Sequence, residues 1–244
     1  VNAEAVTVAD TDEARLGELA RSCKVLVTAD NREAVRNADL ILLAVKPQNM
    51  AEVLAGLTAA MVPSALVISI AAGISTAFIE ERLGEGVRVV RVMPNMPALI
   101  GEGAAAIAPG GHATEADLKR TRHIFDAVGI TVEVKEDLMD AVTGLSGSGP
   151  GYVFLIVEAF ADAGVRMGLP RETALKLIAQ SLLGAAKLCL LGEKPPAELR
   201  AMVTSPGGTT LAGLKVMEEG KLREILMAAV EAATKRSAEL GGRK

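Results

Sequence analysis

Aromatic side chains are scarce in this sequence of 244 residues, which contains no Trp, one Tyr and four Phe. Apolar residues nevertheless make up 50% of the chain and charged residues 23%, a balance typical of a globular protein with a sizeable core. That core must therefore be built from Ala, Val, Leu and Gly, which favours close contacts between helices. The length suits one large domain or two small ones.

Cysteine and histidine are also rare, and neither occurs in the spacing of a known site. Cys23 and Cys189 stand alone, so we interpret both as structural thiols in a reducing compartment. His112 and His123 have no ligand-spaced partners, and we expect no metal site.

Other absences narrow the class of protein. The sequence contains neither an uninterrupted apolar run of about 18 residues nor a signal peptide. Its net charge of −4 and pI near 5.4 argue against a nucleic-acid partner. We therefore expect a cytoplasmic protein that binds neither membrane nor nucleic acid.

The first half of the chain alternates short apolar segments with helical ones. This alternation predicts an α/β fold with right-handed crossovers and a doubly wound, Rossmann-like sheet. The expected strands are residues 5–9, 24–28, 40–45, 65–70, 87–92, 104–108 and 131–134, and the expected helices are residues 11–21, 32–37, 47–61, 75–83 and 115–128.

The glycine-rich turn that opens such a domain is missing. A dinucleotide-binding domain begins with a strand and a Gly-x-Gly-x-x-Gly/Ala turn, whose amides hold the pyrophosphate. No such turn precedes Ala5, and the sequence enters the pattern at what should be the second strand. Two explanations are open: the first strand and turn are truncated, or they belong to disordered residues that the sequence omits.

The second half contains two strongly apolar helical segments, separated by Gly168-Leu-Pro170. In the first of them, Glu158, Asp162 and Arg166 are spaced by four and form one narrow polar stripe. Helices this apolar need burial on several sides, so we interpret residues 140–191 as the core of an oligomer. The alternative is a buried central helix pair within one chain.

Three long motifs carry a family resemblance: LSGSGPGYVF at residues 145–154, EAFADAGVRMGLPRETA at 158–174 and VTSPGGTTLAGLKVMEEGKLR at 203–223. They resemble the C-terminal signature of pyrroline-5-carboxylate reductases, and the resemblance extends over residues 6–240. It implies a dinucleotide-binding domain at residues 1–136 and an all-α dimerisation and substrate domain at residues 137–244. It also implies a homodimer, with dimers commonly assembled further into rings of five.

The resemblance implies a specific reaction. This family reduces the cyclic imine of 1-pyrroline-5-carboxylate with NAD(P)H to give L-proline, the last step of proline synthesis. NADPH is the usual cofactor, and NADH is an alternative. Two other functions stay open: a related Rossmann-type reductase of the hydroxyacid or ketopantoate kind, and a non-enzymatic helical scaffold.

Strand-end turns supply the predicted cofactor site. Small residues allow the backbone to approach a nucleotide, and Lys46 brings a positive charge near its phosphates. Asp10 ends the second strand of the pattern, where an acid would bind the adenosine ribose hydroxyls; its alternative role is a helix N-cap. By resemblance, the site also includes Asn31, Ala44, Val45, Lys46, Pro47, Ile70, Ala71 and Ala72, for which ordinary strand-end turns are the alternative.

The octapeptide VTSPGGTT, residues 203–210, supplies the predicted substrate site. It leads into an apolar helix, whose N-terminal amides suit a carboxylate; a plain capping turn is the alternative. By resemblance, Thr210 is the catalytic residue, with its hydroxyl on the ring nitrogen of the substrate. The predicted substrate-binding residues are Glu136, Gly207, Gly208, Thr209 and Thr210, and Glu193 corresponds to a residue near the active site. Met202 departs from the family, because that position is often polar.

Overall fold

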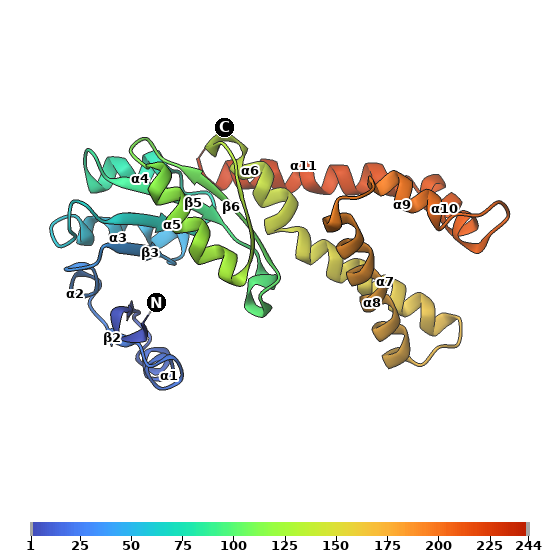
Figure 1. The fold of residues 1–244 in the computed structure, drawn as a ribbon, viewed down its shortest axis with the longest axis horizontal. Coiled ribbons are helices and arrows are strands. Elements are labelled where there is room, and N and C mark those ends of the chain that lie inside the picture. Colours follow the sequence, from blue (N-terminus) through green and yellow to red (C-terminus); the bar gives the residue numbers. More distant parts are fainter. Residues whose placement is uncertain (1, 243–244) are drawn as a thin grey trace. The chain divides into compact units, whose positions relative to one another are not determined.

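The computed structural model describes residues 2–242 and divides the chain into two compact units (Figure 1). Unit 1 consists of the chain up to Gly147 together with the segment that starts at Ala233, and unit 2 is Ser148–Ala232. The division therefore falls after Gly147 rather than after Glu136, and helix α11 (Leu222–Leu240) contributes to both units.

Unit 1 is built on a five-stranded sheet with the order β3-β4-β5-β6-β7. Its strands are β3 (Leu40–Leu43), β4 (Leu66–Ser69), β5 (Arg88–Met93), β6 (Gly103–Pro109) and β7 (Gly129–Glu133). All neighbouring pairs are parallel except β5 and β6. The antiparallel pair was not expected from the sequence. It arises because β5 and β6 are joined by only the 3₁₀ segment η3 (Met96–Ile100), whereas a parallel return needs a longer crossover.

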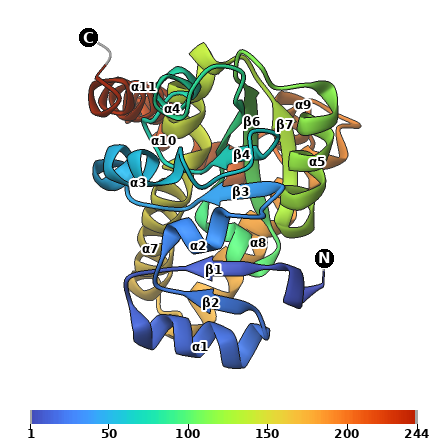
Figure 2. The same ribbon diagram turned by 90° about the vertical axis from the view of Figure 1, so that its left-hand side faces the viewer.

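Helices cover both faces of this sheet, as the doubly wound pattern predicts (Figure 2). Val67 and Val89 join one core with α3 (Met50–Leu57) and α4 (Thr76–Leu83). Ile68 and Val90 point to the opposite face and pack with α5 (Glu115–Phe125). Since β4 is fully buried on both faces, its continuous apolar run identified it in the sequence.

A second, two-stranded sheet precedes the large one in the chain. Its parallel strands are β1 (Thr7–Ala9) and β2 (Leu26–Thr28), followed by α1 (Glu13–Cys23) and α2 (Asn31–Val35) respectively. β1 starts later than predicted, because the 3₁₀ segment η1 (Ala3–Ala5) takes up the preceding residues.

Short helical segments end unit 1 and lead into unit 2. After α5 come η4 (Asp126–Val128), then β7, η5 (Glu136–Leu138), α6 (Met139–Val142) and the π-helical segment η6 (Thr143–Gly147). A further 3₁₀ segment, η2 (Pro47–Asn49), lies between β3 and α3.

Unit 2 is entirely helical in its described structure. It contains α7 (Gly149–Arg166), α8 (Arg171–Leu191), α9 (Pro196–Met202), α10 (Thr209–Glu219) and the first part of α11. The sequence predicted all of these except α9. Close packing of α7 against α8 depends on Gly164, where an added Cβ would approach the Ala174 Cβ to 2.9 Å.

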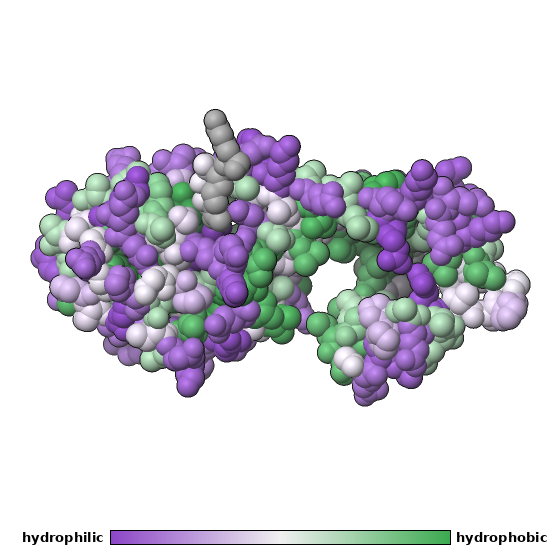
Figure 3. Space-filling view, turned by 90° about the horizontal axis from the view of Figure 1, so that it is seen from above, coloured by the Kyte–Doolittle hydropathy of each residue, from purple (hydrophilic) through white to green (hydrophobic). Residues whose placement is uncertain are grey.

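Much of the apolar surface of unit 2 is exposed in a single chain (Figure 3). α7 buries only Ala161 and α8 only Ala174, while Leu155 is 65% exposed and Leu177 is 56% exposed. Burial within one chain, the alternative for these helices, is therefore wrong. Among the described helices α8 is also long and apolar enough to cross a membrane, so the expected absence of a membrane segment stays a prediction.

Candidate active site

Two of the predicted cofactor turns lie at one edge of the large sheet. Parallel pairing sets Leu43 of β3 beside Ser69 of β4, so residues 44–47 and 70–72 leave their strands at the same edge. Ala44, Lys46 and Pro47 are exposed there. The buried Ser69 Oγ accepts a hydrogen bond from the Ala71 amide at 3.3 Å, which fixes the second turn. Ligands of open α/β sheets bind at this edge, and small residues leave the main chain accessible to a nucleotide.

A third strand end joins the same edge, and no role was predicted for it from the sequence. Because Ser69 is paired with Arg91 of β5, the segment after Met93 lies next to the β4 turn. The Asn95 side chain holds this segment: its Oδ1 accepts from the Ala104 amide at 2.9 Å, and its Nδ2 donates to the Ser146 carbonyl at 3.1 Å. The position of residues 93–97 directly after an apolar strand was the signal that could have identified it.

Asp10 and Asn31 occupy equivalent places in the small sheet. Ala9 pairs with Thr28, so both residues follow parallel strands at the same edge. The helix cap of α1 is Asp12, not Asp10, so the capping alternative for Asp10 is wrong. Asp10 accepts from the Asp12 amide at 3.1 Å, and its side chain remains 33% exposed. Its carboxylate thus stays accessible to a ribose.

Glu136 lies between α4 and the sheet. Its Oε1 accepts from the Thr76 amide at 2.7 Å and lies 3.6 Å from Nη1 of Arg91, and its Oε2 accepts from the Thr76 hydroxyl. The Arg91 side chain is 1% exposed and belongs to β5. Glu136 therefore connects the first residue of α4 to the middle of the sheet, a role that the sequence did not indicate.

The predicted substrate turn in unit 2 forms a helix N-terminus without a side-chain cap. Gly208 is the N-cap of α10, and Thr209 and Thr210 are its first two residues. Neither Thr occupies the N-cap, so neither side chain caps α10. Gly207 has φ +70°, a conformation that favours glycine, and it bends the chain into the helix.

This helix start is suited to bind a carboxylate. The first intrahelical bond of α10 runs from the Ala212 amide to the Gly208 carbonyl at 3.2 Å. The amides of residues 209–211 precede that bond and point out of the helix end. Both threonines are exposed, so hydroxyls and amides are accessible together. Glu193 follows α8 and Met202 ends α9; both are exposed.

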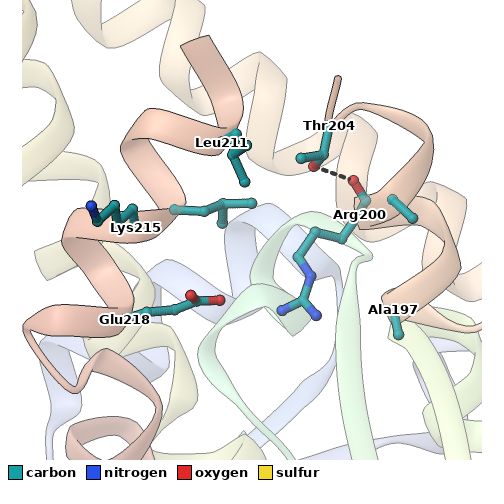
Figure 4. A pocket seen from close by; sticks show the side chains of 8 residues that line it. Ala197, Arg200, Thr204, Leu211, Lys215 and Glu218 are labelled. Carbon is teal, nitrogen blue, oxygen red and sulfur yellow. Dashed lines mark hydrogen bonds between the residues drawn. The ribbon is translucent and has the colours of Figure 1, made fainter. Parts of the chain in front are cut away.

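A groove of about 420 Å³ lies between α9 and α10, close to the turn (Figure 4). Its walls include Arg200, Leu211 and Glu218, and the Thr204 hydroxyl donates to the Arg200 carbonyl at 2.7 Å. Neither Thr209 nor Thr210 lines it. The groove is therefore not assigned to the predicted substrate.

The described residues, 2–242, contain no candidate metal site. Within that range no group of three or more His, Cys, Asp or Glu side chains could hold a metal ion. Cys23 and Cys189 are both exposed free thiols.

Two family models match the chain. One, for pyrroline-5-carboxylate reductase dimerisation, matches residues 136–240. The other, described as NADP oxidoreductase coenzyme F420-dependent, matches residues 2–73. The two matched regions agree with the expected order of a dinucleotide-binding domain followed by a dimerisation domain.

Curated relatives cover almost all of the chain. The pyrroline-5-carboxylate reductase of Methanosarcina acetivorans is 48% identical over 241 residues, which are 99% of this chain and 89% of that protein. The Synechocystis protein of the same name is 47% identical over 238 residues, 98% of this chain and 88% of that protein.

Solved structures give the same result. A pyrroline-5-carboxylate reductase from Coxiella burnetii matches with a TM-score of 0.92 and 39% identity, covering 100% of this chain and 90% of that chain. The Plasmodium falciparum pyrroline carboxylate reductase, solved with NADP bound, has a TM-score of 0.88 and 33% identity, covering 98% and 88% of the two chains. The predicted fold class is confirmed.

Proposed function

Because this chain belongs to the pyrroline-5-carboxylate reductase family, we propose that it reduces 1-pyrroline-5-carboxylate to L-proline with NAD(P)H, the last step of proline synthesis. The observation that carries this proposal is the uncapped start of α10, where Thr209 and Thr210 present amides and hydroxyls together. The substrate is a cyclic imine with a carboxylate, and this helix start offers donors to both groups.

The carboxylate of the substrate is held by the N-terminal amides of α10. A helix N-terminus has unpaired N–H groups and a partial positive charge, which together favour an anion. Gly207 and Gly208 have no side chains beyond hydrogen, so the substrate can approach the turn closely. This holds the ring with its imine next to the Thr210 hydroxyl.

When bound, the nicotinamide would supply a hydride for the imine carbon, and the ring nitrogen would gain a proton. The Thr210 hydroxyl donates a hydrogen bond to the ring nitrogen and orients it. A threonine hydroxyl is too weak an acid to deliver a proton unaided at neutral pH, so the proton comes from water through this hydroxyl. By family resemblance we also propose Glu136 as a substrate-binding residue and Glu193 as a residue near the site; the Glu136 carboxylate itself accepts from Thr76.

The proposed cofactor site comprises Asp10, Asn31 and the strand-end turns at residues 44–47 and 70–72. Ala44 is exposed and Ala72 is partly exposed, and their small side chains leave the main chain accessible to a nucleotide, whereas Ala71 is buried. Lys46 is exposed at the same edge and provides a positive charge for the phosphates.

One assay tests this function against the related reductases. The complete chain is expected to oxidise NADPH with 1-pyrroline-5-carboxylate and to show no more than background oxidation with ketopantoate. Preference for ketopantoate would assign the protein to the other reductases. Failure to bind NADPH in a titration would instead support a non-enzymatic scaffold.

The match of residues 136–240 to the dimerisation family model supports a homodimer. We propose that these dimers assemble further into rings of five and that the protein is cytoplasmic. The free thiols of Cys23 and Cys189 fit a reducing compartment. Sedimentation of the purified protein measures the assembly: a decamer is expected, and a species no larger than a dimer would contradict the ring.

Asp10 is expected to shift the cofactor preference toward NADH. Its carboxylate would repel the 2′-phosphate of NADPH at the ribose position. We expect Asp10→Ser to raise the ratio of kcat/KM for NADPH to kcat/KM for NADH on the order of ten-fold. A like charge about 4 Å away costs about 1 kcal/mol in water and about 4 kcal/mol near a protein surface, and ten-fold corresponds to about 1.4 kcal/mol.

The control for this experiment is Glu18→Gln, which removes the same charge from an exposed position of α1. It should leave the ratio unchanged. A strong NADPH preference that Asp10→Ser does not alter would exclude Asp10 from the ribose site.

A further inference from the structure

The turn after β4 is held from a part of the chain far away in sequence. The last residues of α11 belong to unit 1 (Figure 1), and Gly241, just beyond the helix, lies against Gly73 ahead of α4. Gly241 follows α11, and a Cβ added to it would lie 2.7 Å from the carbonyl oxygen of Gly73. The two main chains are therefore in direct contact at the end of the turn that includes Ala71 and Ala72.

A buried hydrogen bond fixes the same end of α11. The Ser237 hydroxyl donates to Oδ1 of Asp140 at 2.8 Å, and the two residues are 4% and 7% exposed. Because Gly241 donates its amide to the Ser237 carbonyl at 3.1 Å, the position of Ser237 sets that of Gly241. A buried hydrogen bond to a carboxylate is stronger than an exposed neutral one.

The other end of the turn, at Thr76, is held by the short segment that also contains Asp140. Glu136 accepts from Thr76, the first residue of α4, and Asp140 lies four residues further along the chain. One segment, residues 136–140, thus contacts α4 through one carboxylate and α11 through the other. The turn at residues 70–75 lies between these two contacts.

We propose that Ser237–Gly241, which we name the C-terminal latch, positions the β4–α4 turn for the nucleotide. This inference rests on the proposed function, because it takes the turn at Ile70–Ala72 as part of the cofactor site. Ser237 and Gly241 are positioning residues: they act through Asp140 and Gly73 and touch neither cofactor nor substrate. A latch of this kind sets the affinity for the nucleotide and leaves the imine chemistry unchanged.

The test compares two latch variants with a control on the same helix. In Gly241→Ala the added methyl must displace the Gly73 carbonyl. Gly241 does not have a positive φ, so alanine fits its backbone conformation and the substitution alters only the contact with Gly73. Ser237→Ala removes the buried hydroxyl with little change in volume. Arg236→Ala is the control, because it removes only an exposed ion pair with Glu239.

Both latch variants are expected to weaken NADPH binding roughly two- to thirty-fold, the range that mutations of coupled positions usually cover. NADPH affinity is measured by titration without imine, and steady-state rates are measured while the concentrations of NADPH and of the imine are varied in turn. KM for NADPH should rise in parallel, while kcat and KM for the imine change less than about two-fold. Ser237→Thr should restore affinity because it keeps the hydroxyl.

Either of two outcomes would overturn the proposal. Unchanged NADPH affinity in folded Ser237→Ala would overturn it, even if the melting temperature falls, because the latch would then serve stability alone. An equal loss in Arg236→Ala would overturn it as well. If the wild-type protein binds NADPH but does not reduce the imine, the proposed function fails while the latch is still tested by the titration.

Discussion

Thr210→Val should lower turnover about ten- to a hundred-fold while the protein remains folded. Valine keeps the shape and β-branching of threonine but lacks the hydroxyl. A hydrogen bond to the developing amine is worth roughly 1.5 to 3 kcal/mol, and it strengthens as the imine is reduced. The loss should therefore appear in kcat rather than in KM for the substrate. Steady-state kinetics at saturating NADPH give both constants.

Thr209→Val is the matched control, since it removes the neighbouring hydroxyl of the same helix turn. It should cost less than Thr210→Val, because the amide of Thr209 rather than its hydroxyl serves the carboxylate. Normal turnover in Thr210→Val would mean that the turn only binds the substrate carboxylate and that its hydroxyl does not act on the imine. The imine nitrogen would then take its proton directly from solvent.

Leu177→Asp should abolish the dimer at micromolar concentration. Leu177 is 56% exposed in the single chain, on a helix that buries only Ala174. A charge placed in an apolar interface without a partner costs several kcal/mol, and a two-fold axis places two such charges in each dimer. An obligate interface of this family's kind typically exceeds ~2,000 Å² and is rich in apolar side chains. Analytical ultracentrifugation across a dilution series measures the change.

The control is Lys176→Ala on the adjacent position of the same helix. Lys176 forms an exposed ion pair with Glu172 at 2.8 Å, and its side chain is 74% exposed. Exposed pairs of this type contribute about 0 to 1 kcal/mol, so the dimer should persist. A folded wild-type monomer at micromolar concentration would refute the interpretation of these helices as a dimer core.

The sequence was most informative where one local pattern determines the structure. β4 was predicted because its apolar run, bounded by turns, is typical of a strand buried on both faces. The placement of the cofactor turns followed from the same pattern, since parallel strands end at one edge of the sheet. The helices of unit 2 were predicted because their apolar faces are unusually wide.

Contacts between distant segments could not be predicted. Glu136 and Thr76 are sixty positions apart. Nothing in the local sequence around either residue indicates that Glu136 binds the first residue of α4. β6 runs antiparallel to β5 because the connection between residues 93 and 103 is too short for a crossover helix. The pattern of apolar residues in a strand does not reveal the direction of that strand. α9 was missed because its seven residues are too few for a clear helical period.

The shared helix α11 has a consequence for how the protein is made. Asp140 and Ser237 are 97 positions apart, and the chain between them includes all of unit 2. At a synthesis rate of about 5 to 20 residues per second, the ribosome needs roughly 5 to 20 s to make that stretch. The sheet of unit 1 can form during this interval, but the turn after β4 acquires its last contacts only when Gly241 emerges. The apolar helices α7 and α8 of each nascent chain are therefore complete before the turn after β4 has its last contacts.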